Sequence, residues 1–246
     1  MIVRHAVLLG AVLLSALVIA SRAQAFRPFD GTDASVADTG EAGVELQPAG
    51  LLREGAETRL VSPATIVNLG VAPNWEVNAQ GQAETPIGHS RGRTSITDTG
   101  IFAKGVLRPG FLQDRAGPSV ATEFGVLLPQ LNGPSGAGAL WDVIVSEGGS
   151  WGAVHLNIQP ELAMDRHFDL FLDLIIEGPR TWPVRPVAEI FMDRDFGGAR
   201  TRSALLGAIW QVRDNLAFDI GLRGARVDDH SVVELRAGLT FAFAAR

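Results

Sequence analysis

The stretch from Val154 to Leu162, VHLNIQPEL, alternates apolar and polar side chains. Successive side chains of a strand point to opposite faces, so this strand has one face with Val154, Leu156 and Ile158 and another with His155, Asn157, Gln159 and Glu161. A soluble β-protein buries its apolar face, whereas a membrane barrel turns that face to lipid and wets the polar one. The fold class therefore depends on which face points inward.

The same alternation recurs along the chain between short runs of turn residues. It predicts twelve antiparallel strands of about 9–13 residues, near 42–51, 57–70, 74–84, 98–108, 118–129, 138–146, 151–162, 168–178, 184–194, 202–212, 216–226 and 231–243. The one helix-compatible patch, Ala204 to Trp210, is short and lies between strand-like neighbours, so we interpret it as strand.

The first 25 residues have the layout of a secretory signal peptide. Arg4 precedes an apolar run from Ala6 to Ala20, and a small-x-small cleavage site follows at Ala23-Gln24-Ala25. We expect cleavage before Phe26, with a retained amphipathic anchor as the alternative. Residues 26–40 are polar, Gly/Asp-rich and without periodicity, which predicts an extended lead-in before a barrel domain at 41–246.

Charge and composition exclude several classes of protein. Without Arg4 and Arg22, 19 basic residues stand against 27 acidic ones, a net charge near −8 that argues against a nucleic-acid partner. The chain has no cysteine, which excludes disulfides and thiolate metal sites and fits a bacterial envelope protein. Beyond the leader, no apolar run reaches the ~20 residues of a membrane helix.

Three features favour a membrane barrel over a soluble β-protein. The predicted strands match a tilted span of the hydrocarbon core, whereas soluble strands cluster near 5–6 residues. The polar faces carry both charges, and the last strand alternates through Phe241 and Phe243. With no tyrosine in the chain, Phe and Trp have to supply any aromatic girdle. A soluble periplasmic barrel that binds an apolar ligand is the alternative.

We therefore predict an all-β fold, an antiparallel transmembrane β-barrel of about 12 strands in the outer membrane of a Gram-negative bacterium. Short turns at 72–74, 147–150 and 213–215 fall at one end, and long polar breaks at 85–97 and 131–137 fall at the other. A barrel of this size is narrow and largely filled by side chains. The predicted lumen-facing residues are Glu76, Asn78, Glu123, Asp142, His155, Asn157, Glu161, Asp169, Asp173, Arg185, Glu189, Asp219, Arg223, Glu234 and Arg236.

Several phrases resemble the outer-membrane proteins of the MetA-pathway of phenol degradation family. They include RPFDGTDASVADTGEAGVELQPAG, IVNLGVAPNWEVNAQGQAE, WGAVHLNIQPEL and the C-terminal ELRAGLTFAF. The resemblance runs over nearly the whole mature chain and rests on turn phrases and strand patterns. It implies a β-barrel transporter, in some members linked to the catabolism of aromatic compounds, and it carries over no site residues.

No pattern predicts an enzyme. Gly148-Gly149-Ser150-Trp151-Gly152 matches G-x-S-x-G, but the hydrolase elbow needs a following helix, and a strand follows here. A barrel-embedded lipid hydrolase using Ser150 and His155 is a further alternative.

No pattern predicts a metal site or a cofactor either. The mature histidines show no metal-ligand spacing. Asp193-Arg194-Asp195 and Asp228-Asp229 could hold calcium, but local turn chemistry explains them better.

The expected function is an outer-membrane, porin-like transporter that passes or binds small molecules, aromatic or hydrophobic ones among them. Lumen width and charge would then select the solute. The expected partners are the lipid bilayer and the solute, without nucleic acid, and the sequence carries no signature of an oligomeric state.

Overall fold

A computed structural model describes residues 27–245, so the predicted signal peptide lies outside the described part of the chain. The strands are β1 (Glu41–Glu54), β2 (Glu57–Ala72), β3 (Trp75–Pro86), β4 (Ser95–Arg108), β5 (Ser119–Leu127), β6 (Gly138–Gly149), β7 (Gly152–Leu162), β8 (Phe168–Glu177), β9 (Val184–Asp195), β10 (Arg200–Arg213), β11 (Leu216–Val227) and β12 (His230–Ala244). A short 3-10 helix, η1 (Phe111–Gln113), precedes β5. Within the described residues, no helix is long and apolar enough to span a bilayer.

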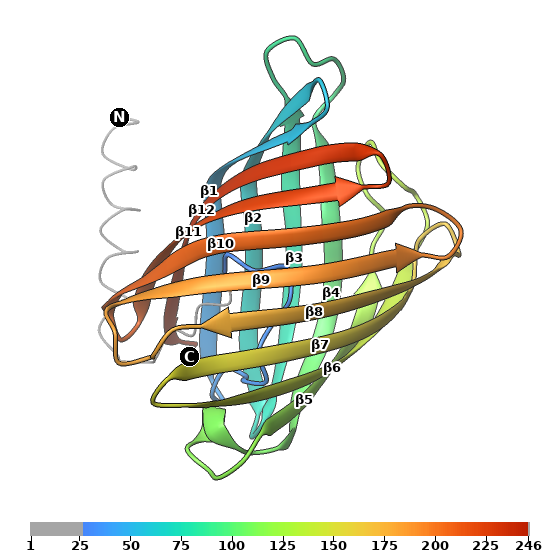
Figure 1. Ribbon diagram of the computed structural model, residues 1–246. Helices are drawn as coiled ribbons and strands as arrows, with labels where there is room; N and C mark the ends of the chain where they lie inside the picture. Colours follow the sequence, from blue (N-terminus) through green and yellow to red (C-terminus); the bar gives the residue numbers. More distant parts are fainter. Residues whose placement is uncertain (1–26, 246) are drawn as a thin grey trace, which may run out of the picture.

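The twelve strands close into one antiparallel barrel in which each strand pairs with its sequence neighbours (Figure 1). The barrel is closed by pairing of β1 with β12, for example Val44 opposite Phe241. Closure leaves no unpaired sheet edge, which a membrane-spanning sheet requires because lipid offers no hydrogen-bond partners. The predicted strand number, and every predicted strand within a few residues at its ends, is confirmed.

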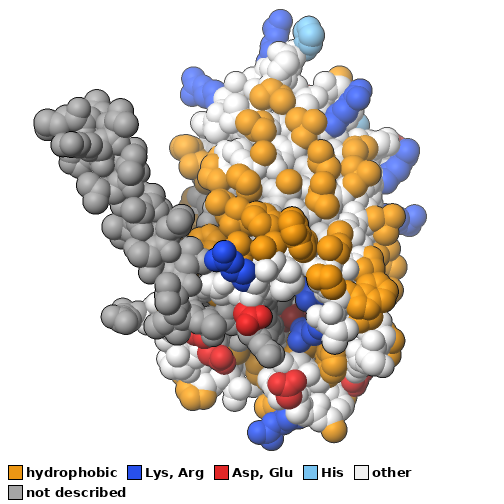
Figure 2. Space-filling view, turned by 90° about the vertical axis from the view of Figure 1, so that its left-hand side faces the viewer, with side chains coloured by type: hydrophobic (Ala, Val, Ile, Leu, Met, Phe, Trp, Pro, Cys, Tyr) orange, Lys and Arg blue, Asp and Glu red, His pale blue; other side chains and the backbone are white. Residues whose placement is uncertain are grey.

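The polar faces of the strands point inward. In β7, Leu156 and Ile158 are 41% and 42% exposed, whereas His155 and Asn157 are fully buried. Large hydrophobic side chains cover the outer wall in a broad band, seen in orange in Figure 2. A monomeric soluble protein rarely exposes so large a continuous apolar surface, but a lipid-facing wall requires one. The membrane barrel is confirmed over the soluble alternative.

The two ends of the barrel differ in their aromatic residues. We call the end that carries Glu41 and Ala244 the terminal end, and the opposite end the far end. Four of the five tryptophans are exposed at the terminal end, at the strand ends or in the turns there, namely Trp75, Trp151, Trp182 and Trp210. The fifth, Trp141, is exposed near the far end of β6. Amphipathic rings at this level fit the boundary between lipid chains and headgroups, so tryptophan supplies the belt without tyrosine.

The predicted division into short and long turns is only partly right. The turns at 73–74, 150–151 and 214–215 do lie at the terminal end, and the loops at 87–94 and 128–137 lie at the far end. However, residues 109–118, which contain η1, form a long connection at the terminal end, and 55–56 and 228–229 are tight turns at the far end. Turn length alone therefore does not distinguish the two ends.

Candidate functional site

The lumen of the barrel is crossed by residues 27–38, which we call the inner segment. In Figure 1 it is the dark blue stretch that runs inside the barrel before β1. Its polar contacts reach side chains all round the barrel wall, namely Gln47, Glu76, Lys104, Ser146, Asn157, Glu189, Asp219 and Arg236. The sequence predicts this stretch as a lead-in before the barrel, and nothing in the pattern places it inside.

One wall of the lumen binds the backbone of the inner segment. Glu189 Oε1 on β9 accepts hydrogen bonds from the amides of Asp30 (2.8 Å) and Gly31 (2.9 Å). Asn157 on β7 accepts from the amide of Thr32 at 3.1 Å and donates to the carbonyl of Thr32 at 2.9 Å. The inner segment does not pair with a strand, so its buried backbone N–H and C=O groups need other hydrogen-bond partners. The side chains of Glu189 and Asn157 supply them.

A second part of the wall, three strands from β9, supplies an arginine. Arg236 on β12 donates to the carbonyl of Pro28 at 2.7 Å, to Asp30 Oδ1 at 2.9 Å and to Glu234 Oε2 at 2.8 Å. Burial would raise the pKa of the Asp30 carboxyl, but the guanidinium groups of Arg236 and Arg223 outweigh it and lower that pKa below its usual value. Asp30 is therefore ionised at neutral pH and paired with Arg236.

Towards the terminal end, the segment is held by a buried polar pair on β6 and β7. Ser146 Oγ accepts a hydrogen bond from the amide of Ala34 at 2.9 Å and lies 2.8 Å from His155 Nδ1. The other ring nitrogen of His155 lies 3.4 Å from Glu177 Oε1. Ser146 was not among the predicted lumen residues, although it shares the strand face of Asp142 and alternation alone would have found it.

Two small apolar contacts complete the anchoring. Phe29 packs against Val187, Ile209 and Ala217, where β9, β10 and β11 turn apolar rather than polar side chains inward. Ala34 is fully buried in a second cluster, which consists of Leu112, Ala121 and Ile144 with Phe111 against it. The inner segment is thus fixed by hydrogen bonds along its length and by two apolar contacts.

Two cavities adjoin the inner segment. The larger, about 390 Å³, reaches the strand ends of the far end at Glu54, Glu84 and Val227. The smaller, about 140 Å³, lies beside Glu76, Lys104 and Asp142. Arg27, Phe29 and Asp30 line both. The lumen was predicted to be narrow and filled by wall side chains; instead, a large part of the filling is the chain's own N-terminal segment.

All fifteen predicted lumen residues have low exposure. Ten are buried, namely Glu76, Asn78, Asp142, His155, Asn157, Asp173, Glu189, Asp219, Glu234 and Arg236. Five are half-buried, namely Glu123, Glu161, Asp169, Arg185 and Arg223. Their part in selecting a solute stays a prediction. The residues predicted for selection also include those that hold the inner segment, such as Asn157, Glu189 and Arg236.

The alternative hydrolase site is not assembled among the described residues. Ser150 lies exposed in the turn between β6 and β7, and the strand that follows it cannot supply the helix of a nucleophile elbow. His155 is buried in the lumen, where its ring contacts Ser146 and Glu177. The hydroxyl of Ser146 is in turn occupied by the amide of Ala34.

No protein-family model matches the sequence, and no curated protein matches it. Solved structures do match the fold. An outer membrane channel from Pseudomonas putida F1 is 10% identical, with a TM-score of 0.65 over 87% of this chain and 100% of that one. The KdgM porin, in a complex with disordered oligogalacturonate, is 9% identical, with a TM-score of 0.53 over 81% of this chain and 98% of that one. This chain therefore has the fold of outer-membrane channels.

Proposed function

We propose that this protein is an outer-membrane channel that binds and passes small solutes, and that its inner segment controls the passage. The observation that carries the proposal is a lumen with a cavity open towards the far end and closed by a segment that is not part of the sheet. Export by a cleaved leader at residues 1–25, and an orientation with the terminal end in the periplasm, belong to the same proposal.

The larger cavity favours a small amphipathic solute. Its walls combine charges of both signs, including Arg223, Glu84 and Asp98, with the apolar side chains of Phe29, Leu52 and Ile66. At about 390 Å³ it lies within the range of pockets that hold small organic ligands, roughly 300–1,000 Å³. The resemblance of several sequence phrases to the MetA-pathway of phenol degradation family supports, as part of this proposal, an aromatic ring that carries a polar group.

Passage requires the inner segment to move. Arg27, Phe29 and Asp30 form a wall common to the two cavities, so a solute cannot cross while they stay in place. The hydrogen bonds that hold the segment can be replaced by water in a wet lumen, where each contributes only about 0.5–1.5 kcal/mol, and more where a charge takes part. A segment fixed in this way can be displaced without breaking the barrel.

A reversible tether tests this proposal. The chain has no cysteine, so Ala34→Cys and Ser146→Cys together place its only thiols where the amide of Ala34 meets the hydroxyl of Ser146 at 2.9 Å. We expect the oxidised double variant in liposomes to lose uptake of phenol-sized solutes, and reduction to restore the uptake. Each single variant, treated with the same oxidant, serves as the matched control. Equal uptake in the oxidised and reduced double variant would refute control by the segment.

A further inference from the structure

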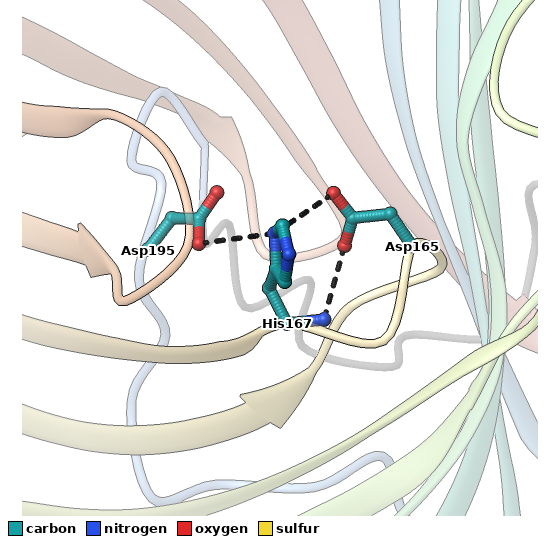
Figure 3. Close-up of side chains that lie close together, drawn as sticks. All are labelled: Asp165, His167 and Asp195. Atoms are coloured by element: carbon teal, nitrogen blue, oxygen red, sulfur yellow. Dashed lines mark hydrogen bonds and ion pairs between the residues drawn. The ribbon is translucent and has the colours of Figure 1, made fainter.

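A cluster of potential metal ligands lies at the far end, outside the site described above. Two neighbouring turns, 163–167 and 196–199, bring Asp165 and His167 beside Asp195, the last residue of β9 (Figure 3). His167 Nδ1 lies 3.3 Å from Asp165 Oδ2 and 3.7 Å from Asp195 Oδ1, and one ligand atom from each residue lies within 4.8 Å of the others. Residues from two separate turns thus converge on one point.

The strand register brings further carboxylates to this cluster but no lysine or arginine. Glu161 on β7 pairs with Asp169 on β8, and Asp169 pairs with Asp195 on β9, so three carboxylates stand side by side across three strands. Like charges directly opposite each other destabilise a sheet, with Cβ atoms about 4.5–5.5 Å apart. Among the three carboxylates of Glu161, Asp169 and Asp195, only Asp195 forms an ion pair within residues 27–245, and its partner is His167.

Asp169 is an independent sign that a partner is missing. Its Oδ1 is buried and has no hydrogen-bond partner in the described part of the chain. Buried acceptors without donors are costly, and a cation satisfies several at once.

The turn 196–199 closes over the cluster because it contains two glycines. A Cβ at Gly197 would overlap the ring of His167, and a Cβ at Gly198 would overlap Asp195 Oδ2. A larger residue at either position would therefore require the side chain of His167 or Asp195 to shift. The turn thereby leaves space for the His167 ring next to two carboxylates.

We propose that Asp165, His167, Asp169 and Asp195 form a binding site for a divalent first-row transition metal ion, with Zn²⁺ as the probe. An imidazole nitrogen together with carboxylate oxygens is a ligand set that zinc accepts, whereas calcium and magnesium take oxygen ligands. The ion would neutralise the row of carboxylates and tie the β7–β8 turn to the β9–β10 turn at the mouth of the lumen. The proposal stands independently of solute transport.

The test is calorimetric titration of the full mature barrel, without an affinity tag, with Zn²⁺. We expect one bound ion per chain, and an affinity lowered at least tenfold by His167→Ala and by Asp195→Asn. His89→Ala removes an exposed histidine from the far-end loop at 87–94 and serves as the matched control, with unchanged affinity. Retention of the unboiled gel mobility of the folded barrel shows that each variant is folded.

A second measurement reports on the geometry of the site. Zn²⁺ should slow amide exchange in both turns, 163–167 and 196–199, and leave the 87–94 loop unchanged. The proposal is overturned if wild type does not bind Zn²⁺, or if His167→Ala binds it as tightly as wild type. Calcium binding as tight as that of zinc, and insensitive to His167→Ala, would also overturn it, because the site would then be made of carboxylates alone.

Discussion

Replacing Leu156 by arginine tests the orientation of the strands in the membrane. Leu156 is the fifth residue of β7, which runs from Gly152 to Leu162, and its side chain points outward, 41% exposed. A strand tilted by about 40° advances roughly 2.5 Å along the membrane normal per residue. Leu156 therefore lies roughly 10 Å from the terminal end of β7 and 15 Å from the far end, near the middle of an apolar band about 25 Å tall.

The position sets the expected cost. An arginine on the lipid face costs about 2–4 kcal/mol at the bilayer midplane and about 0–1 kcal/mol near the interfaces. We expect Leu156→Arg to lower the free energy of unfolding by the larger amount. Leu162→Arg, on the same face of the same strand but at its end, is the matched control and should cost about 0–1 kcal/mol.

In the assay, guanidinium chloride reversibly unfolds the barrel in lipid vesicles. The folded fraction at each concentration is measured from the gel mobility of unboiled samples. Leu156→Arg should shift the midpoint while the slope stays the same, because the surface exposed on unfolding does not change. A cost for Leu156→Arg below about 0.5 kcal/mol, or equal costs at the two positions, would refute the assignment of this face to lipid.

Three other predictions concern the inner segment and the aromatic belt. Glu189→Ala removes the acceptor for the amides of Asp30 and Gly31, so we expect the segment to open about 1–3 kcal/mol more easily, measured as faster exchange of those amides. A side chain at Gly70 would overlap the backbone oxygen of Asp38, so Gly70→Val should displace the segment and raise the conductance in planar bilayers; unchanged conductance would contradict this. Lipids brominated near the headgroup should quench tryptophan fluorescence more than lipids brominated at the chain end, because most tryptophans lie at the terminal end.

The strands were predictable because each carries its own signal. Alternation in a segment such as Val154–Leu162 reports that its two faces meet different surroundings, and turn residues mark where it ends. The signal is the same whichever face is inside, so strand length had to separate a membrane barrel from a soluble one. In β10 the alternation is weak because two apolar side chains, Leu205 and Ile209, point inward, and Ile209 packs in an apolar cluster; this is why that strand looked partly helical.

The inner segment could not be predicted in the same way. Its backbone is satisfied by side chains of the wall instead of a neighbouring strand, which leaves no periodicity in residues 27–38. Its partners are also remote, since Asp30 and Glu189 are separated by 159 positions in the chain. The ligand cluster at the far end is equally remote, because Asp195 joins Asp165 and His167 only through the pairing of β8 with β9.

The most direct test of the account is the single-channel conductance of the mature chain beside that of a variant lacking residues 28–37. If the inner segment closes the lumen, the intact protein should conduct weakly and the deletion variant should conduct several-fold more, with both showing the gel mobility of a folded barrel. Equal conductance of the two folded proteins would contradict the account, because the lumen would then be closed by its own wall.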